Sequence, residues 1–192
     1  MALSAAREIV EEEGLAGLTA RRIAAKIGYS AGTLYNVFDD LDDLIIRLNG
    51  RTLDALYEAL AAIPANGDPE ADLLTLARGY FEFTRENANL WNLLFEHHLP
   101  GDQLLPDWHH EKIGRLLGLT DRSLASFFGP GRDAERLHTA QVIWSSLHGM
   151  SSLETQRKLI PGDSIEAMAT SLIKNYLAGL RTSTADGPGG KR

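Results

Sequence analysis

The stretch LTARRIAAKIGYSAGTLYNVF, residues 18–38, decides the fold of this chain. Thr19 is predicted to cap a helix over residues 20–27, because a threonine hydroxyl can accept a hydrogen bond from a free amide of the first turn. Gly28 tolerates the positive φ of a tight turn, and Ser30 is placed to cap a short second helix that ends near residue 38. The pattern predicts two short helices joined by a tight turn, which is a helix-turn-helix.

The side chains of these two helices divide into an apolar set and an outward set. Those expected to seat the pair on a preceding helix over residues 2–13 are apolar: Ile23, Ile27, Tyr29, Leu34 and Val37. Three residues of the second helix are left facing outward: Thr33, Tyr35 and Asn36. The second helix is therefore the candidate recognition helix, because that helix enters the major groove in such motifs.

Basic charge is concentrated where the motif lies. The whole chain has a formal net charge of -7, whereas a basic footprint is expected of a protein that binds nucleic acid. Between Gly14 and Phe38, however, the chain carries Arg21, Arg22 and Lys26 and no acidic residue. On charge alone, an ordinary surface helix without acidic residues is the better explanation.

Several residues of the motif form a more specific combination: Thr19, the Ile23-Ala24 pair, Gly28, Ser30, the run Gly32-Thr33-Leu34-Tyr35, and Phe38. With this combination the segment resembles the DNA-binding segment of the TetR family of transcriptional regulators. The resemblance implies a homodimer that binds double-stranded operator DNA, most simply a repressor that a small apolar or aromatic effector releases. The residues that it assigns to DNA binding are Thr19, Arg21, Arg22, Ser30, Ala31, Gly32, Thr33, Tyr35 and Asn36.

The resemblance also implies different roles for these residues. Thr19 and Tyr35 would hold phosphates, while Ala31, Thr33 and Asn36 would face bases, since asparagine can read adenine with two hydrogen bonds. Packing of Tyr35 against the first helix is the alternative. For Ser30, a cap is a simpler role than a contact.

Three departures from the family pattern reduce the expected number of phosphate contacts. Val37 stands where a histidine is common, the segment Asp39–Asp43 at the start of the next helix lacks the usual lysine, and no basic arm precedes the first expected helix. We therefore expect weaker or more salt-sensitive binding than is typical, because few charges would hold the DNA backbone.

Apolar residues recur at helical spacing almost throughout, so the sequence predicts an all-α protein of about nine helices. The expected helices cover residues 2–13, 20–27, 31–38, 40–62, 70–85, 88–98, 106–128, 134–156 and 164–180, and Gly14 is expected to end the first in a left-handed cap. We expect a DNA-binding domain over 1–46, a helical effector-binding and dimerisation domain over 47–181, and a disordered tail over 182–192.

The last two expected helices, 134–156 and 164–180, are predicted to form the dimer interface. The second carries a broad apolar stripe, which can bury against the same chain or against a partner: Ile165, Met168, Ala169, Leu172, Ile173, Tyr176 and Leu180. In the first, Trp144, His148 and Gly149 resemble the Trp-His-Gly signature of one C-terminal subfamily of these regulators. His148 could be a ligand contact or a hydrogen-bonded core histidine.

An effector pocket is expected among aromatic residues, although such a set more often forms plain core. Its expected residues are Tyr80, Phe83, Trp91, Phe95, Trp108, Trp144 and His148. The histidine pairs 97–98 and 109–110 are expected at the surface rather than at a metal site, because adjacent histidines on a helix point apart. No cofactor is predicted.

Other classes of protein fit the sequence less well. The chain has no cysteine, no secretory signal pattern and no run of roughly 18 apolar residues, so the sequence predicts a cytoplasmic protein without a membrane segment. It has no nucleophile elbow, phosphate loop, HExxH or nucleotide fingerprint, which argues against an enzyme. The alternative function is a helical protein-interaction or ligand-binding module with reduced DNA binding.

Overall fold

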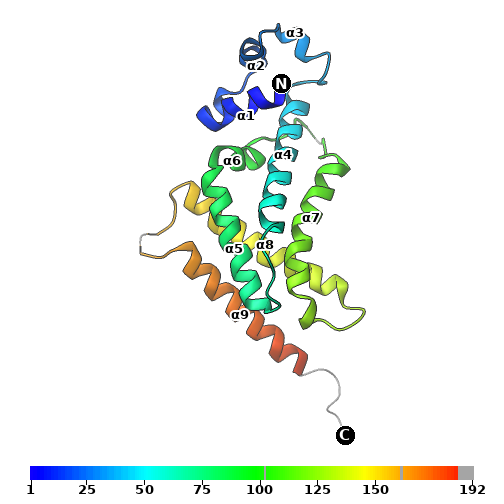
Figure 1. Cartoon of the computed structure of the whole chain (residues 1–192), viewed down its shortest axis with the longest axis vertical. Helices are drawn as coiled ribbons and strands as arrows, with labels where there is room; N and C mark the ends of the chain where they lie inside the picture. The colour runs from blue at the N-terminus through cyan, green and yellow to red at the C-terminus, as the bar shows by residue number, and fades with distance from the viewer. Residues whose placement is uncertain (102, 161, 186–192) are drawn as a thin grey trace. The chain divides into compact units, whose positions relative to one another are not determined.

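The computed structural model describes residues 1–101, 103–160 and 162–185, and this part of the chain is entirely helical, without a β-strand (Figure 1). Its nine α-helices are α1 (Ala2–Glu13), α2 (Ala20–Ile27), α3 (Ala31–Leu34), α4 (Leu41–Ala61), α5 (Pro69–Glu86), α6 (Ala88–Glu96), α7 (Asp107–Ser123), α8 (Asp133–Thr155) and α9 (Ile165–Ala185), with short 3-10 turns η1 (Leu15–Gly17) and η2 (Ala125–Phe127). The predicted all-α class is confirmed. Among the described residues, none of the helices is long and apolar enough to cross a membrane.

The chain packs into two compact units, each built from separated parts of the sequence. The N-terminal unit comprises Met1–Tyr57 and Thr84–Ile113, and the C-terminal unit comprises Glu58–Phe83 and the chain from Gly114 onward. Helices α4, α5 and α7 contribute residues to both units. The functional division at residue 46 stays a prediction.

Side chains next to the first turns determine where several helices begin. The Asp40 carboxylate accepts a hydrogen bond from the amide of Asp43 at 2.7 Å and so caps α4. Helix α5 starts at Pro69, where the missing amide costs nothing, and Asp68 accepts from the amide of Glu70 at 3.1 Å. Ser164 caps α9 in the same way. These starts follow from local sequence alone.

The core of the N-terminal unit is built by α1 to α4 together with α6. Leu90 and Leu93 of α6 are buried in one hydrophobic cluster with residues of the helix-turn-helix such as Ile23 and Leu34. The Asn89 side chain adds a polar tie, since its Nδ2 donates to the Glu11 carbonyl at 2.9 Å. Helix α6, which follows the motif by some fifty residues, is therefore part of the same core.

In the C-terminal unit, α9 packs against α8 with one of its two apolar stripes. The stripe Ile165, Ala169, Ile173 and Leu177 is fully buried. The neighbouring stripe of Met168, Leu172, Tyr176 and Leu180 is only half-buried. The apolar stripe that the sequence predicts for α9 is therefore divided into a fully buried face and a half-buried face.

Several helices end where the periodicity did not predict. Helix α6 stops at Glu96, because His97 is extended. Helix α7 stops at Ser123, because the next amide, that of Leu124, donates to the Asp121 carbonyl three residues back, a 3-10 bond. Gly14 has the predicted positive φ of 67°, but its ψ of -164° lies outside the left-handed helical region.

The disordered tail that the sequence predicts over 182–192 overlaps the end of α9. Helix α9 continues to Ala185, five residues beyond the expected end, because no glycine or proline interrupts this stretch before residue 187. Inside the added turn, the Thr182 hydroxyl donates to the Gly179 carbonyl at 2.8 Å. The remainder of the expected tail, 186–192, lies outside the described residues.

Candidate nucleic-acid interface

Helices α2 and α3 form the helix-turn-helix, and α2 has the start and end that the sequence predicts. The Thr19 hydroxyl accepts a hydrogen bond from the amide of Arg22 at 3.3 Å. Gly28 ends α2 in the left-handed conformation, with φ 76° and ψ 27°. Ile23 and Ala24 are buried. The tight turn that the motif requires is thus present.

Helix α3 is a single turn and ends at Leu34, well before residue 38. The amides of Val37 and Phe38 both donate to the Leu34 carbonyl at 3.0 Å, so the chain leaves the helix through tight turns. Ser30 occupies the N-cap position but makes no cap hydrogen bond with its side chain; its hydroxyl lies 3.0 Å from the Thr33 hydroxyl. The prediction that Ser30 stands at the N-cap of this helix is therefore confirmed, but the prediction that its side chain caps the helix by a hydrogen bond is wrong.

Two residues expected to seat the motif on α1 are exposed instead. Tyr29 is 55% exposed and Val37 is 70% exposed, while Phe38 is buried. Because α3 ends at Leu34, a helical spacing of three residues no longer predicts the direction of Val37. Tyr29 directly follows the left-handed Gly28, so helical periodicity does not extend to it either.

The outward face of α3 and its following turn is open to solvent. Tyr35 is 50% exposed, so it is not buried against α1. Asn36 and Gly32 are exposed, and Ala31 and Thr33 are half-buried. This face can present a hydroxyl, a phenol and an amide to a partner, and the assignment of these residues to DNA stays a prediction.

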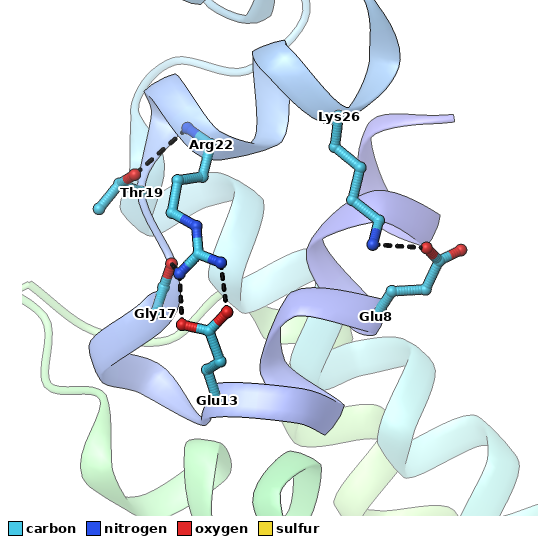
Figure 2. Close-up of polar contacts among 6 residues, drawn as sticks. All are labelled: Glu8, Glu13, Gly17, Thr19, Arg22 and Lys26. Carbon is cyan, nitrogen blue, oxygen red and sulfur yellow. Dashed lines mark hydrogen bonds and ion pairs between the residues drawn. The ribbon is translucent and has the colours of Figure 1, made fainter.

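Two of the three basic residues of the motif are held by acidic residues of α1 (Figure 2). The Arg22 guanidinium forms two hydrogen bonds with the Glu13 carboxylate, and its Nη1 also donates to the Gly17 carbonyl at 3.1 Å. Lys26 Nζ lies 2.9 Å from Glu8 Oε2. The hydrogen bond raises the pKa of Arg22 and lowers that of Glu13. Arg22 and Lys26 therefore fix α2 on α1.

Arg21 differs from its neighbour. It is exposed, and within the described residues no carboxylate pairs with it. We expect Arg21→Ala to reduce the slope of log affinity against log salt by about 1, because one phosphate contact is lost. Arg22→Ala is expected to lower the melting temperature and leave the slope unchanged. Fluorescence anisotropy across a salt series on one DNA duplex measures the slope for both variants, and thermal unfolding measures their melting temperatures.

These two arginines are matched controls for each other, because they are adjacent, equally charged and both exposed. A changed slope for Arg22→Ala together with an unchanged slope for Arg21→Ala would reverse the assignment. Equal changes in both would mean that the Glu13 pair opens on DNA.

The start of α4, which follows the recognition face, is acidic and its carboxylates have partners within the protein. Asp43 pairs with Arg47 at 2.8 Å, and Asp42 Oδ1 lies 2.7 Å from Nε2 of His97. The His97 side chain is almost fully buried, so the expected surface role of His97 is wrong. The physical reason is that this residue, extended at the end of α6, turns toward α4. Arg47, the cation beside these carboxylates, is engaged by Asp43 within the protein.

The residues of the expected effector pocket fall into both units. In the C-terminal unit, the Tyr80 hydroxyl and His148 Nδ1 are 3.1 Å apart, and the rings of Trp144 and His148 stack at 5.8 Å and 14°. Burial lowers the pKa of His148 and raises that of Tyr80. Phe83 is buried in the same unit. His148 is thus hydrogen-bonded to Tyr80, and its contact with a ligand stays a prediction.

The other three aromatic residues of that set lie in the N-terminal unit. Trp91 is buried, and its ring meets that of Phe95 edge to face at 5.4 Å. Trp108 packs so closely on α4 that a Cβ at Gly50 would lie 2.6 Å from its Cζ3. Whether these residues bind an effector stays a prediction. Among the described residues, no group of three or more metal-ligating side chains occurs.

Sequence reasoning missed two buried polar residues, Asn49 and His109. Asn49 is buried within α4, and His109 was expected at the surface with His110. Adjacent helical residues point about 100° apart, so one histidine of such a pair can face inward. Asn49 stands between Leu48 and Leu53 on the apolar face, and this position was the signal available in the sequence.

Comparison with known proteins agrees with this geometry. The model of the bacterial regulatory proteins of the tetR family matches residues 2–48, which hold the helix-turn-helix. The model of the tetracyclin repressor-like C-terminal domain matches residues 73–176, more than half of the chain. The chain belongs to the TetR family. It is therefore a DNA-binding transcriptional regulator by family, and the family is one of regulators rather than enzymes.

Individual relatives of this TetR-family chain extend over most of its length. The uncharacterized HTH-type transcriptional regulator Rv0681 of Mycobacterium tuberculosis is 25% identical over 179 residues, which cover 93% of this chain and 79% of that protein. The uncharacterized regulator YobS of Bacillus subtilis is 24% identical, covering 94% and 91%. A solved protein of unknown function from Rhodococcus sp. RHA1 superimposes with a TM-score of 0.73 at 25% identity, covering 93% of this chain and 92% of that one.

Proposed function

We propose that this TetR-family regulator is a repressor that binds its operator through α3 and the following turn. The observation that carries the proposal is the open face of Tyr35 and Asn36 with half-buried Thr33, held on a helix-turn-helix in which Arg22 and Lys26 fix α2 on α1. Unpaired Arg21 lies at the start of α2. Such a face supplies base readout from α3 and few phosphate contacts.

The proposal is tested at the two most exposed polar side chains of that face. Tyr35→Ala is expected to weaken binding to every DNA sequence, because a phosphate contact carries no sequence information. Asn36→Ala is expected to cost about 1 to 3 kcal/mol at one base pair of the operator and little elsewhere. Mobility shifts with a palindrome from the protein's own promoter region, and with single base-pair changes in it, measure both effects.

Tyr29 provides the matched control, because it is a similarly exposed tyrosine at the turn but is outside the assigned contacts. Tyr29→Ala is expected to bind the operator like the unmodified protein. Wild-type binding by folded Tyr35→Ala and Asn36→Ala variants would refute the docking. A complete lack of salt-dependent DNA binding would favour the helical interaction module instead.

We further propose that the operator is bound by a homodimer formed through α8 and α9. The half-buried stripe of α9, which includes Leu172 and Tyr176, supports this because it is apolar and not consumed by the packing of α9 on α8. A two-fold dimer would place its recognition helices about 34 to 36 Å apart, or a multiple of that distance.

The effector is proposed to be an apolar or aromatic small molecule. The aromatic content of both units supports this, as does the polar trio of Tyr80, Trp144 and His148. An effector can release the operator only through a difference in affinity between operator-competent and incompetent states, and a tenfold change needs about 1.4 kcal/mol of coupling.

A further inference from the structure

Two polar side chains in the interior of the N-terminal unit have polar atoms that nothing satisfies. Asn49 of α4 is 4% exposed and His109 of α7 is 5% exposed. Asn49 Oδ1 and His109 Nδ1 are buried, and neither has a hydrogen-bond partner in the part of the chain that the structure describes. More than nine in ten buried polar groups in proteins have a partner, and an unsatisfied one is costly. This pair therefore needs an explanation.

The two side chains are turned to the same side of one helix contact. Gly50 lies against Trp108, and Asp54 binds Lys112 with both carboxylate oxygens at 2.6 Å. Position 50 thus meets 108 and position 54 meets 112, so the two helices run in the same direction here.

Helical geometry then fixes the directions of the unsatisfied pair. Asn49 comes one position before Gly50 in α4, and His109 comes one position after Trp108 in α7. Each position turns an α-helix by about 100°. For two helices that run in parallel and face each other, these opposite steps turn both side chains to the same side. Their burial identifies it as an interior side.

The charges around this pair are balanced. Burial lowers the pKa of His109, and the nearby His110 and Lys112 lower it further, so the imidazole is neutral at pH 7. Lys112 is neutralised by Asp54. The pair therefore offers one amide and one neutral imidazole, with no net charge to meet an ionic ligand.

We propose that Asn49 and His109 are the polar anchors for a hydroxyl group on an apolar effector. The proposal rests on the proposed function, in which the chain binds such an effector. A hydroxyl donates one hydrogen bond and can accept others, so it satisfies both groups when one presents an acceptor and the other a donor, as Asn49 Oδ1 does together with a His109 imidazole that is protonated at Nδ1. A carboxylate or an ammonium would enter this interior without a counter-charge, which is unfavourable.

The test compares hydroxyl compounds with their own methyl ethers on the full chain in the absence of DNA. The probes are 4-ethylphenol, 2-naphthol and octan-1-ol, each against its ether, which has the same apolar body but cannot donate. At least one alcohol is expected to bind about tenfold more tightly than its ether, as measured by calorimetry or thermal shift, because the ether leaves an acceptor unpaired. This arm needs no variant and is informative even if a variant fails to fold.

Variants then test whether the preference for alcohols over ethers depends on Asn49 and His109. Asn49→Leu and His109→Phe are each expected to bring the ratio of alcohol to ether affinity close to one, and to raise the melting temperature of the free protein by removing an unsatisfied polar group. Thr52→Val is the control: Thr52 lies on the same helix and is equally buried, but its hydroxyl already donates to the Leu48 carbonyl at 3.3 Å. That variant is expected to keep the full preference.

The outcomes separate this inference from the effector proposal. Equal affinity for alcohols and ethers, or a preference that survives in Asn49→Leu and His109→Phe, would overturn it. If ethers and alcohols release the operator equally, the effector proposal stands and the hydroxyl anchor is wrong. If an alcohol binds with the expected preference and operator affinity does not change, the anchor stands and effector control is wrong.

Discussion

Replacing Leu93 by alanine is expected to lower the free energy of unfolding of the protein by about 2 to 5 kcal/mol, and the structure places it at the upper part of that range. Leu93 has no exposed area and packs in the same cluster as Ile23 and Leu34 of the helix-turn-helix. Removal of three heavy atoms from such a site loses their transfer free energy and leaves a cavity. Urea unfolding followed by circular dichroism measures the change.

Leu104→Ala is the matched control, because the same atoms are removed from a side chain that is 87% exposed. Its expected effect is within about 0.5 kcal/mol. Since Leu93 supports the motif itself, its variant is also expected to lose operator binding at temperatures where the control still binds. Equal stability of the two variants would show that α6 is not part of the core that supports the motif.

The second large effect is expected at the proposed dimer interface. A double variant with Leu172→Glu and Tyr176→Glu is expected to be a monomer at micromolar concentration in sedimentation experiments. The reason is that two buried charges would face their symmetry mates across the two-fold axis without partners. Operator affinity should then fall by about 10² to 10⁴, because the second half-site is no longer bound at high effective concentration.

Ala178→Glu is the control for this variant. Ala178 is exposed on α9, and its direction is roughly opposite to that of Tyr176, because two residues turn the helix by about 200°. The control is expected to remain a dimer with unchanged operator affinity. Far-UV circular dichroism shows whether both variants are folded, and a double variant that stays dimeric would place the interface elsewhere.

Local chemistry was enough to predict α2 and its turn. The Thr19 cap and the left-handed Gly28 depend only on neighbouring backbone atoms, so their sequence signals are complete within ten residues. The start of α4 at the Asp40 cap belongs to the same class. The family resemblance rests on this stretch, and for that reason the sequence was sufficient to recognise it.

Tertiary packing decided how the motif is held and where its helices end. The sequence does not say that Arg22 binds Glu13, nine residues away, instead of a phosphate. It does not say that Phe38 rather than Val37 is buried, because that depends on α3 ending after one turn. In the first case a contact with α1 decides the arrangement, and in the second the end of α3 decides it.

The sequence by itself determined the helical class and the position of the motif, because periodicity and capping are local properties of the chain. Only the tertiary structure decided that Leu93 belongs to the core of the motif, that α9 divides its apolar residues between two faces, and that Asn49 and His109 turn inward together. These facts depend on which helices meet and in what direction. Burial and contact between distant segments are collective properties, and no stretch of sequence contains them alone.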